Sequence, residues 1–296
     1  MCWIRGSDDT PKLTSPPRSG LMLVEIRNLR VQFPAATGWS DVVRNVSLTL
    51  GQEKLGIVGE SGSGKSLTAR SILRLLPPKA RMTSDTLRFD TIDILRADER
   101  AMRRIRGARA GLILQDPKYS LNPVMTAGDQ IAEAWRVHRG GGRKLAMLAA
   151  IDLLSQVQIR DPAHVAKAYP HELSGGMGQR VMIAMMLAPD PELLIADEPT
   201  SALDATVQAE ILRLIEDLVS RRGMGLILIS HDLPLVSHFC DRVVVMYSGR
   251  IVEEVPAVDL AHAQHPYTQG LLECLPSLTR RQNRLPVMQR DASWLT

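Results

Sequence analysis

The stretch Gly59-Glu60-Ser61-Gly62-Ser63-Gly64-Lys65-Ser66 decides the fold of this chain. It matches the phosphate-binding loop pattern, in which two glycines separated by four residues are followed by Lys and by Ser or Thr. The apolar residues 55–58 before it predict a buried strand, and the apolar periodicity of residues 67–76 after it predicts a helix. Because the pattern functions between a strand and a helix, the sequence predicts that this loop binds the phosphates of a nucleotide.

Each residue type in the loop suits a triphosphate. Glycines let the backbone wrap the phosphates, and the helix that follows offers unpaired N–H groups and a partial positive charge. We expect Lys65 to contact the β- and γ-phosphates and the Ser66 hydroxyl to bind Mg²⁺. A dinucleotide-binding loop would need a third glycine where the chain has Leu67. The residues predicted to contact the nucleotide here are Gly59, Glu60, Ser61, Gly62, Ser63, Gly64, Lys65, Ser66 and Leu67.

The composition sets the class of protein. The chain has 296 residues, 45% of them hydrophobic and 23% charged, which predicts one large domain or a domain with an inserted subdomain. The net charge of +4 does not by itself indicate nucleic-acid binding. Three widely spaced cysteines form neither a zinc pattern nor a disulfide framework, which suits a reducing cytosol. No apolar run is long enough to span a bilayer. Residues 1–21 predict a disordered tail, with Met22 as an alternative start.

Residues 86–94 predict a strand and a turn, and further strands are predicted along the chain at residues 23–33, 42–50, 111–114, 193–196, 226–229, 242–247 and 250–255. The last two flank Ser248-Gly249, which is a hairpin signal. Residues 205–222 predict an amphipathic helix that ends near Gly223. Because strands are followed by helices through the middle of the chain, we expect a largely parallel sheet that binds ligands at its strand C-termini.

Two segments depart from this alternation. Residues 119–172 contain helical stretches and little strand signal, so they predict a helical insertion, with a flexible joint at residues 139–143. Six arginines lie between residues 96 and 109. A nucleic-acid patch and a solvated helix of mixed charge both explain them; the second interpretation is favoured, because Asp98 and Glu99 lie among them.

Polar side chains follow three of the predicted strands. We expect Asp197 to hold Mg²⁺ and Glu198 to accept a proton from, or orient, an attacking water. A helix cap is the alternative for this pair, disfavoured because Pro199 follows directly and the phosphate loop already requires a magnesium ligand. Gln115 would sense the γ-phosphate and the metal, and His231 would contact the γ-phosphate; either residue alone would be interpreted as an ordinary surface or structural residue.

A second helix start lies at Ser174-Gly175-Gly176, before the apolar run 181–187, and it is also suited to hold phosphate. A single nucleotide needs one set of phosphate contacts from a loop of the first kind. The second helix end is therefore free to meet a nucleotide that another protomer holds.

In this order of motifs the chain resembles the ATP-binding subunits of ATP-binding-cassette (ABC) transporters, over roughly residues 23 to 276. The motifs are the phosphate loop, Gln115, the signature 173–177, Asp197-Glu198, the segment 201–204 and His231. The resemblance implies an α/β fold: a P-loop NTPase, ABC nucleotide-binding domain with a mixed sheet core and an inserted helical subdomain. It implies catalytic roles for Lys65, Glu198 and His231, and Mg²⁺ ligation by Ser66, Gln115 and Asp197. The further nucleotide contacts it implies are Phe33, stacking on adenine; Gln115; Ser174, Gly175, Gly176 and Gln179, closing on the partner's ATP; and Asp204, at the dimer seam.

A narrower resemblance is carried by residues 115–117, 120–123 and 265–272, the last reading His-Pro-Tyr-Thr-Gln-Gly-Leu-Leu. These stretches are similar to the ATPases of oligopeptide, dipeptide and nickel importers. Many members of that group end in a cysteine-rich segment thought to hold an iron–sulfur cluster. Only Cys274 lies near the tail here, so we expect no iron–sulfur cluster.

The resemblance implies an ATPase that powers import across a membrane, with ATP and Mg²⁺ as cofactors. Its expected partners are a second ATPase subunit, identical or sibling, two membrane permease subunits and, indirectly, a periplasmic or extracellular solute-binding protein, without nucleic acid. We expect a peripheral position on the cytoplasmic face of the inner membrane, and peptides as the solute, with nickel or a metal chelate second. The expected organisation is a tail (1–21), an ABC ATPase domain (22–260, helical subdomain about 119–172) and a C-terminal extension (261–296).

Alternative functions are less compatible with the residues. A non-transport cassette ATPase acting on nucleic acid or ribosomes would typically carry two fused cassettes or a long coiled coil, and this chain shows neither. A metabolic phosphate-loop kinase would have no use for the signature 173–177. A non-catalytic regulatory subunit is disfavoured because the predicted catalytic residues are all present.

Overall fold

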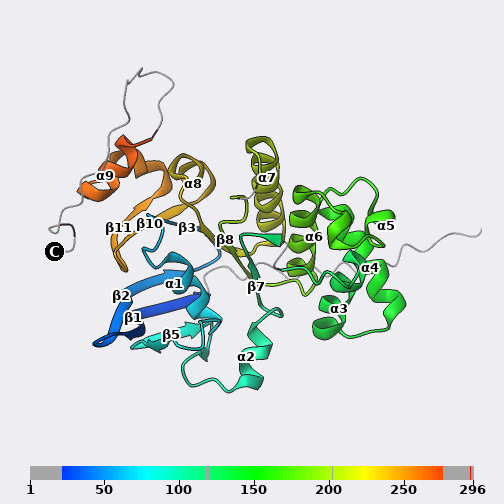
Figure 1. Cartoon of the computed structure of the whole chain (residues 1–296), viewed down its shortest axis with the longest axis horizontal. Coiled ribbons are helices and arrows are strands. Elements are labelled where there is room, and N and C mark those ends of the chain that lie inside the picture. Colours follow the sequence, from blue (N-terminus) through cyan, green and yellow to red (C-terminus); the bar gives the residue numbers. More distant parts are fainter. Residues whose placement is uncertain (1–21, 118–119, 202, 276–293, 295–296) are drawn as a thin grey trace, which may run out of the picture.

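Two β-sheets and a group of helices make up the described part of the chain, which is residues 22–117, 120–201, 203–275 and 294 of a computed structural model (Figure 1). The expected tail 1–21, Ala202 of the segment 201–204, and most of residues 276–296 of the expected extension lie outside the described residues.

The larger sheet has the strand order β11-β10-β3-β9-β8-β7. Its strands are β3 (Lys54–Val58), β7 (Ala110–Ile113), β8 (Leu193–Asp197), β9 (Gly225–Ile229), β10 (Arg242–Tyr247) and β11 (Arg250–Pro256). All neighbouring pairs are parallel except β10 and β11, which form the hairpin predicted at Ser248-Gly249. Strands buried on both faces need continuous apolar runs, and β8 and β9 are buried at every residue. The predicted, largely parallel sheet is confirmed.

The second sheet is antiparallel and lies beside the first (Figure 1). Its order is β2-β1-β5-β6, with β4 also paired to β1. The strands are β1 (Val24–Ala35), β2 (Gly38–Leu50), β4 (Arg81–Thr83), β5 (Thr86–Phe89) and β6 (Ile92–Asp93). The sequence predicted strands over β1, β2, β5 and β6 but missed the short β4. It also did not show that these strands form a separate sheet, because pairing is decided by contacts between distant segments.

Helices cover both faces of the larger sheet and extend beyond its edge. They are α1 (Lys65–Ile72), α2 (Glu99–Ile105), α3 (Ala127–Arg139), α4 (Arg143–Gln156), α5 (Pro162–Val165), α6 (Gly175–Leu187), α7 (Ala205–Arg222), α8 (Leu233–Phe239) and α9 (Pro266–Glu273), with 3₁₀ turns η2 (Pro170–Glu172) and η3 (Ala257–His262). Helix α1 ends before residue 76, where the sequence prediction placed its end, because Arg74 adopts a left-handed φ of 50° and Pro77 follows closely. Among the described residues, no helix combines the length and apolar character needed to cross a bilayer.

Helices α3, α4, α5 and α6 form the group drawn in green, away from the antiparallel sheet (Figure 1). Gly140 and Gly141, at the predicted joint, have φ of 74° and 90° and allow the chain to turn from α3 into α4. The apolar faces of these helices share one core with the larger sheet, through residues such as Ile131, Leu154 and Val181. The helical character predicted for residues 119–172 is observed; the boundaries of a subdomain there stay a prediction.

The larger sheet separates two hydrophobic cores. Leu194 of β8 faces the core shared with α3–α8, whereas its neighbour Ile195 faces the core beneath the antiparallel sheet and α1. The packing of a core on each face holds the sheet in place. Because β3, β7, β8 and β9 are parallel, their C-terminal ends lie at one edge of this sheet.

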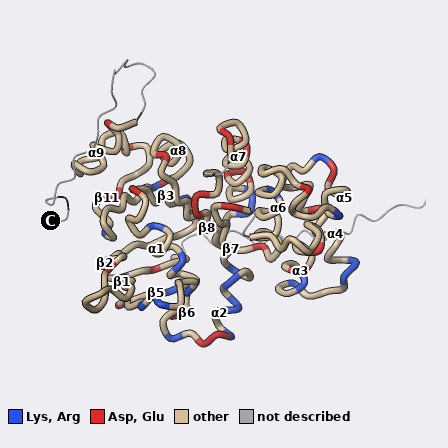
Figure 2. The backbone as a smooth tube through the Cα atoms, in the orientation of Figure 1, with Lys and Arg blue, Asp and Glu red and all other residues tan. Residues whose placement is uncertain are grey.

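The arginine-rich segment is partly structural. Asp98 caps the start of helix α2 by accepting a hydrogen bond from the Ala101 amide, and the blue segments around α2 in Figure 2 mark the nearby arginines. Arg106 pairs with Glu99, and Arg109 binds both Glu192 and Asp90 across 2.7–3.0 Å. These contacts support the interpretation of this segment as a helix of mixed charge.

Candidate nucleotide-binding site

The phosphate loop connects the end of β3 to the start of α1, in the predicted setting. Gly59, Gly62 and Gly64 have φ of 144°, 81° and 98°, in the range that side chains disfavour. A Cβ atom at Gly59 would also lie 2.1 Å from the Met246 carbonyl oxygen of β10. The glycine at position 59 is therefore required both by its backbone conformation and by the closeness of β10.

Lys65 lies across the inside of this loop. Its Nζ donates hydrogen bonds of 2.8 Å to the carbonyl oxygens of both Gly59 and Glu60, and the residue is only 5% exposed. Burial lowers the pKa of Lys65 from its usual range, while the negative charges of Glu198, Asp197 and Glu60 oppose this shift. The amine is thus a desolvated cation close to three carboxylates, and an anionic phosphate would be a favourable partner for it.

Ser66 and Asp197 come together from elements 131 residues apart. The Ser66 hydroxyl donates a 2.6 Å hydrogen bond to Asp197 Oδ1, and Arg70 of α1 forms a 2.8 Å ion pair with Asp197 Oδ2. The Asp197 side chain is 6% exposed. A hydroxyl and a carboxylate side by side are oxygen ligands of the kind Mg²⁺ takes, and Mg²⁺ in nucleotide sites uses few protein ligands beside the phosphates. The described residues contain no cluster of three or more His, Cys, Asp or Glu side chains that would hold a metal alone, so this pair fits a nucleotide-linked Mg²⁺ site.

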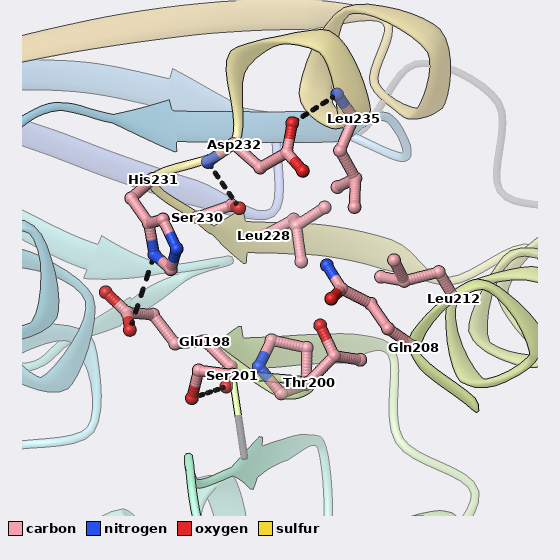
Figure 3. A pocket seen from close by; sticks show the side chains of 11 residues that line it. Glu198, Thr200, Ser201, Gln208, Leu212, Leu228, Ser230, His231, Asp232 and Leu235 are labelled. Atoms are coloured by element: carbon pink, nitrogen blue, oxygen red, sulfur yellow. Dashed lines mark hydrogen bonds and ion pairs between the residues drawn. The ribbon is translucent and has the colours of Figure 1, made fainter. Parts of the chain in front are cut away.

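Glu198 and His231 line a pocket at the same edge of the sheet (Figure 3). The Glu198 carboxylate points toward the His231 ring, with 3.7 Å between Oε2 and Nδ1. Glu198 has a left-handed φ of 50°, which is uncommon for a residue other than glycine and is frequent at functional sites. Its side chain is about one-quarter exposed and that of His231 about two-thirds, so both can reach a ligand.

The pocket itself has a volume of ≈ 90 Å³, enough for water-sized molecules but not for a nucleotide. Its walls come from the ends of β8 and β9, from α7 and from the start of α8. Ser230 and Asp232 shape one wall: the Asp232 amide donates to Ser230 Oγ, and Asp232 Oδ1 caps α8 by accepting from the Leu235 amide, both at 3.0 Å. Ser230 and Asp232 in this wall are therefore held by local hydrogen bonds.

Gln115 follows β7 at the same edge of the sheet and is exposed. Strands β7 and β8 are neighbours and parallel, which places Gln115 on the side of the sheet where Asp197 ends its strand. Its contact with metal or γ-phosphate stays a prediction.

The second predicted phosphate site starts helix α6. The Ser174 hydroxyl accepts a 3.3 Å hydrogen bond from the Met177 amide, and Ser174 and Gly175 are exposed. Helix α6 belongs to the green helical group, whereas the phosphate loop lies at the start of α1, beside the antiparallel sheet (Figure 1). The fold of a single chain thus separates the two helix ends.

Three other predicted contact residues have local structural roles. Gln179 is 1% exposed and donates a 2.5 Å hydrogen bond to the Pro199 carbonyl, linking α6 to the segment after Glu198. Asp204 caps α7 by accepting from the amides of Thr206 and Val207 at 3.1 and 3.0 Å. Phe33 of β1 is half-buried against the core beneath the antiparallel sheet. The nucleotide contacts of these three residues stay predictions.

Two residues that contact the site were not predicted from the sequence. Arg70 lies four residues after Ser66, a spacing that puts both on one helix face and so places Arg70 near the predicted Mg²⁺ site; the spacing does not identify Asp197 as its partner. Tyr267 accepts a hydrogen bond from the backbone of the phosphate loop although 207 residues separate the partners. No local sequence pattern indicates such a contact.

Comparison with known proteins points in one direction. The family model described as ABC transporter matches residues 43–201. A probable peptide ABC transporter ATP-binding protein of Sinorhizobium fredii is 48% identical over 279 residues, which cover 93% of this chain and 83% of that protein. The dipeptide transport ATP-binding protein DppD of Escherichia coli is 46% identical over 267 residues, covering 90% and 82%. One similar solved structure is the ATP-binding cassette MJ0796, in a dimeric post-hydrolysis state bound to ADP and Pi. It superposes on this chain with a TM-score of 0.68 at 26% sequence identity, and the match covers 79% of this chain and 98% of that one.

Proposed function

The chain belongs to the ABC transporter family, and from this premise we propose that it is the ATP-hydrolysing subunit of a membrane importer that takes up peptides. The names of its relatives support the peptide class: the proteins from S. fredii and E. coli are a probable peptide transporter subunit and a dipeptide transporter subunit. No observation favours nickel or a metal chelate over peptides.

The observation that carries the proposal is the convergence of two groups at one edge of the sheet. One group is the phosphate loop with Lys65 and Ser66, and Ser66 is hydrogen-bonded to Asp197. The other is the Glu198–His231 pair, in which Glu198 directly follows β8 and His231 lies two residues after the end of β9. The first group supplies phosphate and metal binding, and the second supplies a carboxylate and an imidazole for chemistry.

Each residue then has a defined task. The loop amides and Lys65 bind the β- and γ-phosphates. Ser66 and Asp197 would hold Mg²⁺, which supplies charge neutralisation on the phosphate oxygens. Glu198 accepts a proton from the attacking water, and His231, 3.7 Å from the Glu198 carboxylate, contacts the γ-phosphate. Gln115 reports the presence of γ-phosphate and metal to the helical group.

A complete site requires a second cassette. The start of α6 is an exposed helix end with Ser174 as its cap, and the fold keeps it away from the phosphate loop of its own chain. Ser174, Gly175 and Gly176 of one subunit then close on the ATP that the other subunit holds, with Asp204 near the seam. The MJ0796 cassette, a structural neighbour, is dimeric in its ADP- and Pi-bound state.

The remaining partners follow from the transporter role. Two permease subunits in the membrane receive the motion of the helical group, and a separate solute-binding protein delivers the peptide. The subunit is peripheral, at the cytoplasmic face of the membrane.

The test is ATP hydrolysis by the purified full-length chain, alone and with its partner cassette. Glu198→Gln should reduce the turnover rate by about 10²–10⁴-fold, the usual contribution of a general base, while ATP binding is preserved. Glu133→Gln is the matched control, because Glu133 is an exposed residue of α3 in the helical group; it should hydrolyse ATP at the wild-type rate. Full turnover by Glu198→Gln would contradict the role of Glu198.

A further inference from the structure

Tyr267 connects the C-terminal helix α9 to the phosphate loop. Its side chain is fully buried, and its hydroxyl oxygen accepts a 3.0 Å hydrogen bond from the backbone N–H of Glu60. Helix α9 lies at the far end of the molecule from the helical group, beyond β10 and β11 (Figure 1). The contact therefore joins the segment 265–272, whose chemical purpose the sequence does not explain, to the element that binds phosphate.

The position of Tyr267 is fixed from several sides. Its ring packs against Tyr247 of β10 and against Trp294, with centroid distances of 4.4 and 5.7 Å. The Tyr267 amide donates to His265 Nδ1 at 3.2 Å, which caps the start of α9. The His265 amide in turn donates to the Glu253 carboxylate of β11 at 3.1 Å. The hydroxyl is thus presented to the loop by a packed and hydrogen-bonded support.

The peptide unit that Tyr267 contacts also holds Lys65. The N–H of Glu60 and the C=O of Gly59 belong to one planar trans peptide, so they point in opposite directions. The N–H faces Tyr267, and the C=O accepts the 2.8 Å hydrogen bond from Lys65 Nζ. If this peptide rotated, both hydrogen bonds would change together.

We propose that Tyr267 is a positioning residue for nucleotide binding, which fixes the Gly59–Glu60 peptide and through it the Lys65 amine in the phosphate loop. The proposal deepens the ATPase function and rests on it. It assigns a task to the C-terminal segment: to hold the phosphate loop in the conformation that receives the β- and γ-phosphates. Because the hydroxyl lies outside the loop, Tyr267 acts on ATP only through the loop backbone.

The alternative is that Tyr267 is only a core residue whose buried hydroxyl needs a hydrogen-bond partner. The two explanations differ in what Tyr267→Phe changes, because this variant keeps the ring in its aromatic cluster and removes only the hydroxyl. Tyr247→Phe is the matched control: it removes a hydroxyl from the same cluster, and among the described residues the Tyr247 hydroxyl makes no hydrogen bond with the loop.

The experiment measures the binding of a fluorescent ATP analogue to the full-length chain, together with KM and kcat for ATP hydrolysis. Tyr267→Phe should weaken ATP binding and raise KM by about 2–10-fold, which corresponds to the loss of one hydrogen bond, with kcat changed by less than about twofold. Tyr247→Phe should match the wild type. Equal ATP affinity in Tyr267→Phe and the wild type would overturn the proposal.

Amide hydrogen exchange without nucleotide gives a second readout that is independent of the ATPase function. In Tyr267→Phe the Glu60 amide should exchange faster than in the wild type and in Tyr247→Phe, while the amides of the larger sheet keep their protection. Unchanged exchange at Glu60 would overturn the proposal, even if the wild-type chain proved not to bind ATP. A wild-type chain that fails to bind ATP would instead contradict the proposed function.

Discussion

Replacing Gly59 by alanine should damage both the stability of the protein and its nucleotide site. A Cβ atom at this position would lie 2.1 Å from the Met246 carbonyl oxygen, whereas real Cβ contacts stay beyond 3.0 Å. That oxygen belongs to the backbone of β10 and cannot rotate away, so the loop or the strand must shift by about 1 Å. Overpacking of this kind costs about 1–3 kcal/mol. The φ of 144° adds about 1–3 kcal/mol for a residue with a side chain, so we expect a loss of about 2–6 kcal/mol in the free energy of unfolding.

Gly62→Ala is the matched control in the same loop. Its φ of 81° also disfavours alanine, but a Cβ there would meet nothing within 4 Å, so only about 1–2 kcal/mol should be lost. The assay is urea denaturation of the full-length variants, analysed by linear extrapolation, followed by ATP binding under conditions where each is folded. If Gly59→Ala proved no less stable than Gly62→Ala, the close packing of β10 against the loop would not carry the expected energetic cost.

Three further outcomes follow from the same contacts. Asp204→Ala removes the acceptor of two helix-start amides and should lower the unfolding free energy by about 1 kcal/mol; an unchanged urea midpoint would contradict the capping role. Arg70→Met removes the ion pair with the buried Asp197 and should cost about 1–2 kcal/mol, discounted because the guanidinium is partly exposed; a variant as stable as the wild type would contradict this. Burial lowers the pKa of Lys65, so the ATP affinity of the wild type should decline as the pH rises through that lowered pKa and the amine loses its charge. Arginine stays charged, so the ATP affinity of Lys65→Arg should not decline from its own neutral-pH value at alkaline pH. Equal pH profiles of the two proteins, in a titration with the ATP analogue, would contradict the assignment of Lys65 as the phosphate-binding cation.

The elements that the sequence predicted best are those specified by residues close together in the chain. The phosphate loop, the strand that ends at Asp197 and the helix that ends at Gly223 are each specified by residues within a short window, and the structure has all three elements. The end of α1 was placed too late, because the apolar spacing continues through Leu76 while the backbone turns at Arg74. Periodicity describes which face is buried, not where the helix stops.

Contacts between segments far apart in the sequence could not be predicted from these local patterns. Nothing in the order of strands showed that β1, β2 and β5 leave the parallel sheet for a separate antiparallel one. The carboxylate of Asp197 was predicted as a metal ligand, but its ion pair with Arg70 appeared only in the structure. The contact of Tyr267 with Glu60 depends on the packing of α9 against β10, which is a property of the folded chain.

The most direct test of the proposed function is peptide uptake by the assembled importer in sealed vesicles, with this subunit, its partner cassette, the permeases and the solute-binding protein present. With the wild-type subunit, we expect ATP-driven accumulation of a labelled peptide; with Glu198→Gln in this subunit, accumulation should cease although ATP still binds. Undiminished peptide uptake with the Glu198→Gln subunit, or no peptide uptake with the wild-type subunit in a complex that hydrolyses ATP, would contradict the central claim that ATP hydrolysis at this site powers peptide import.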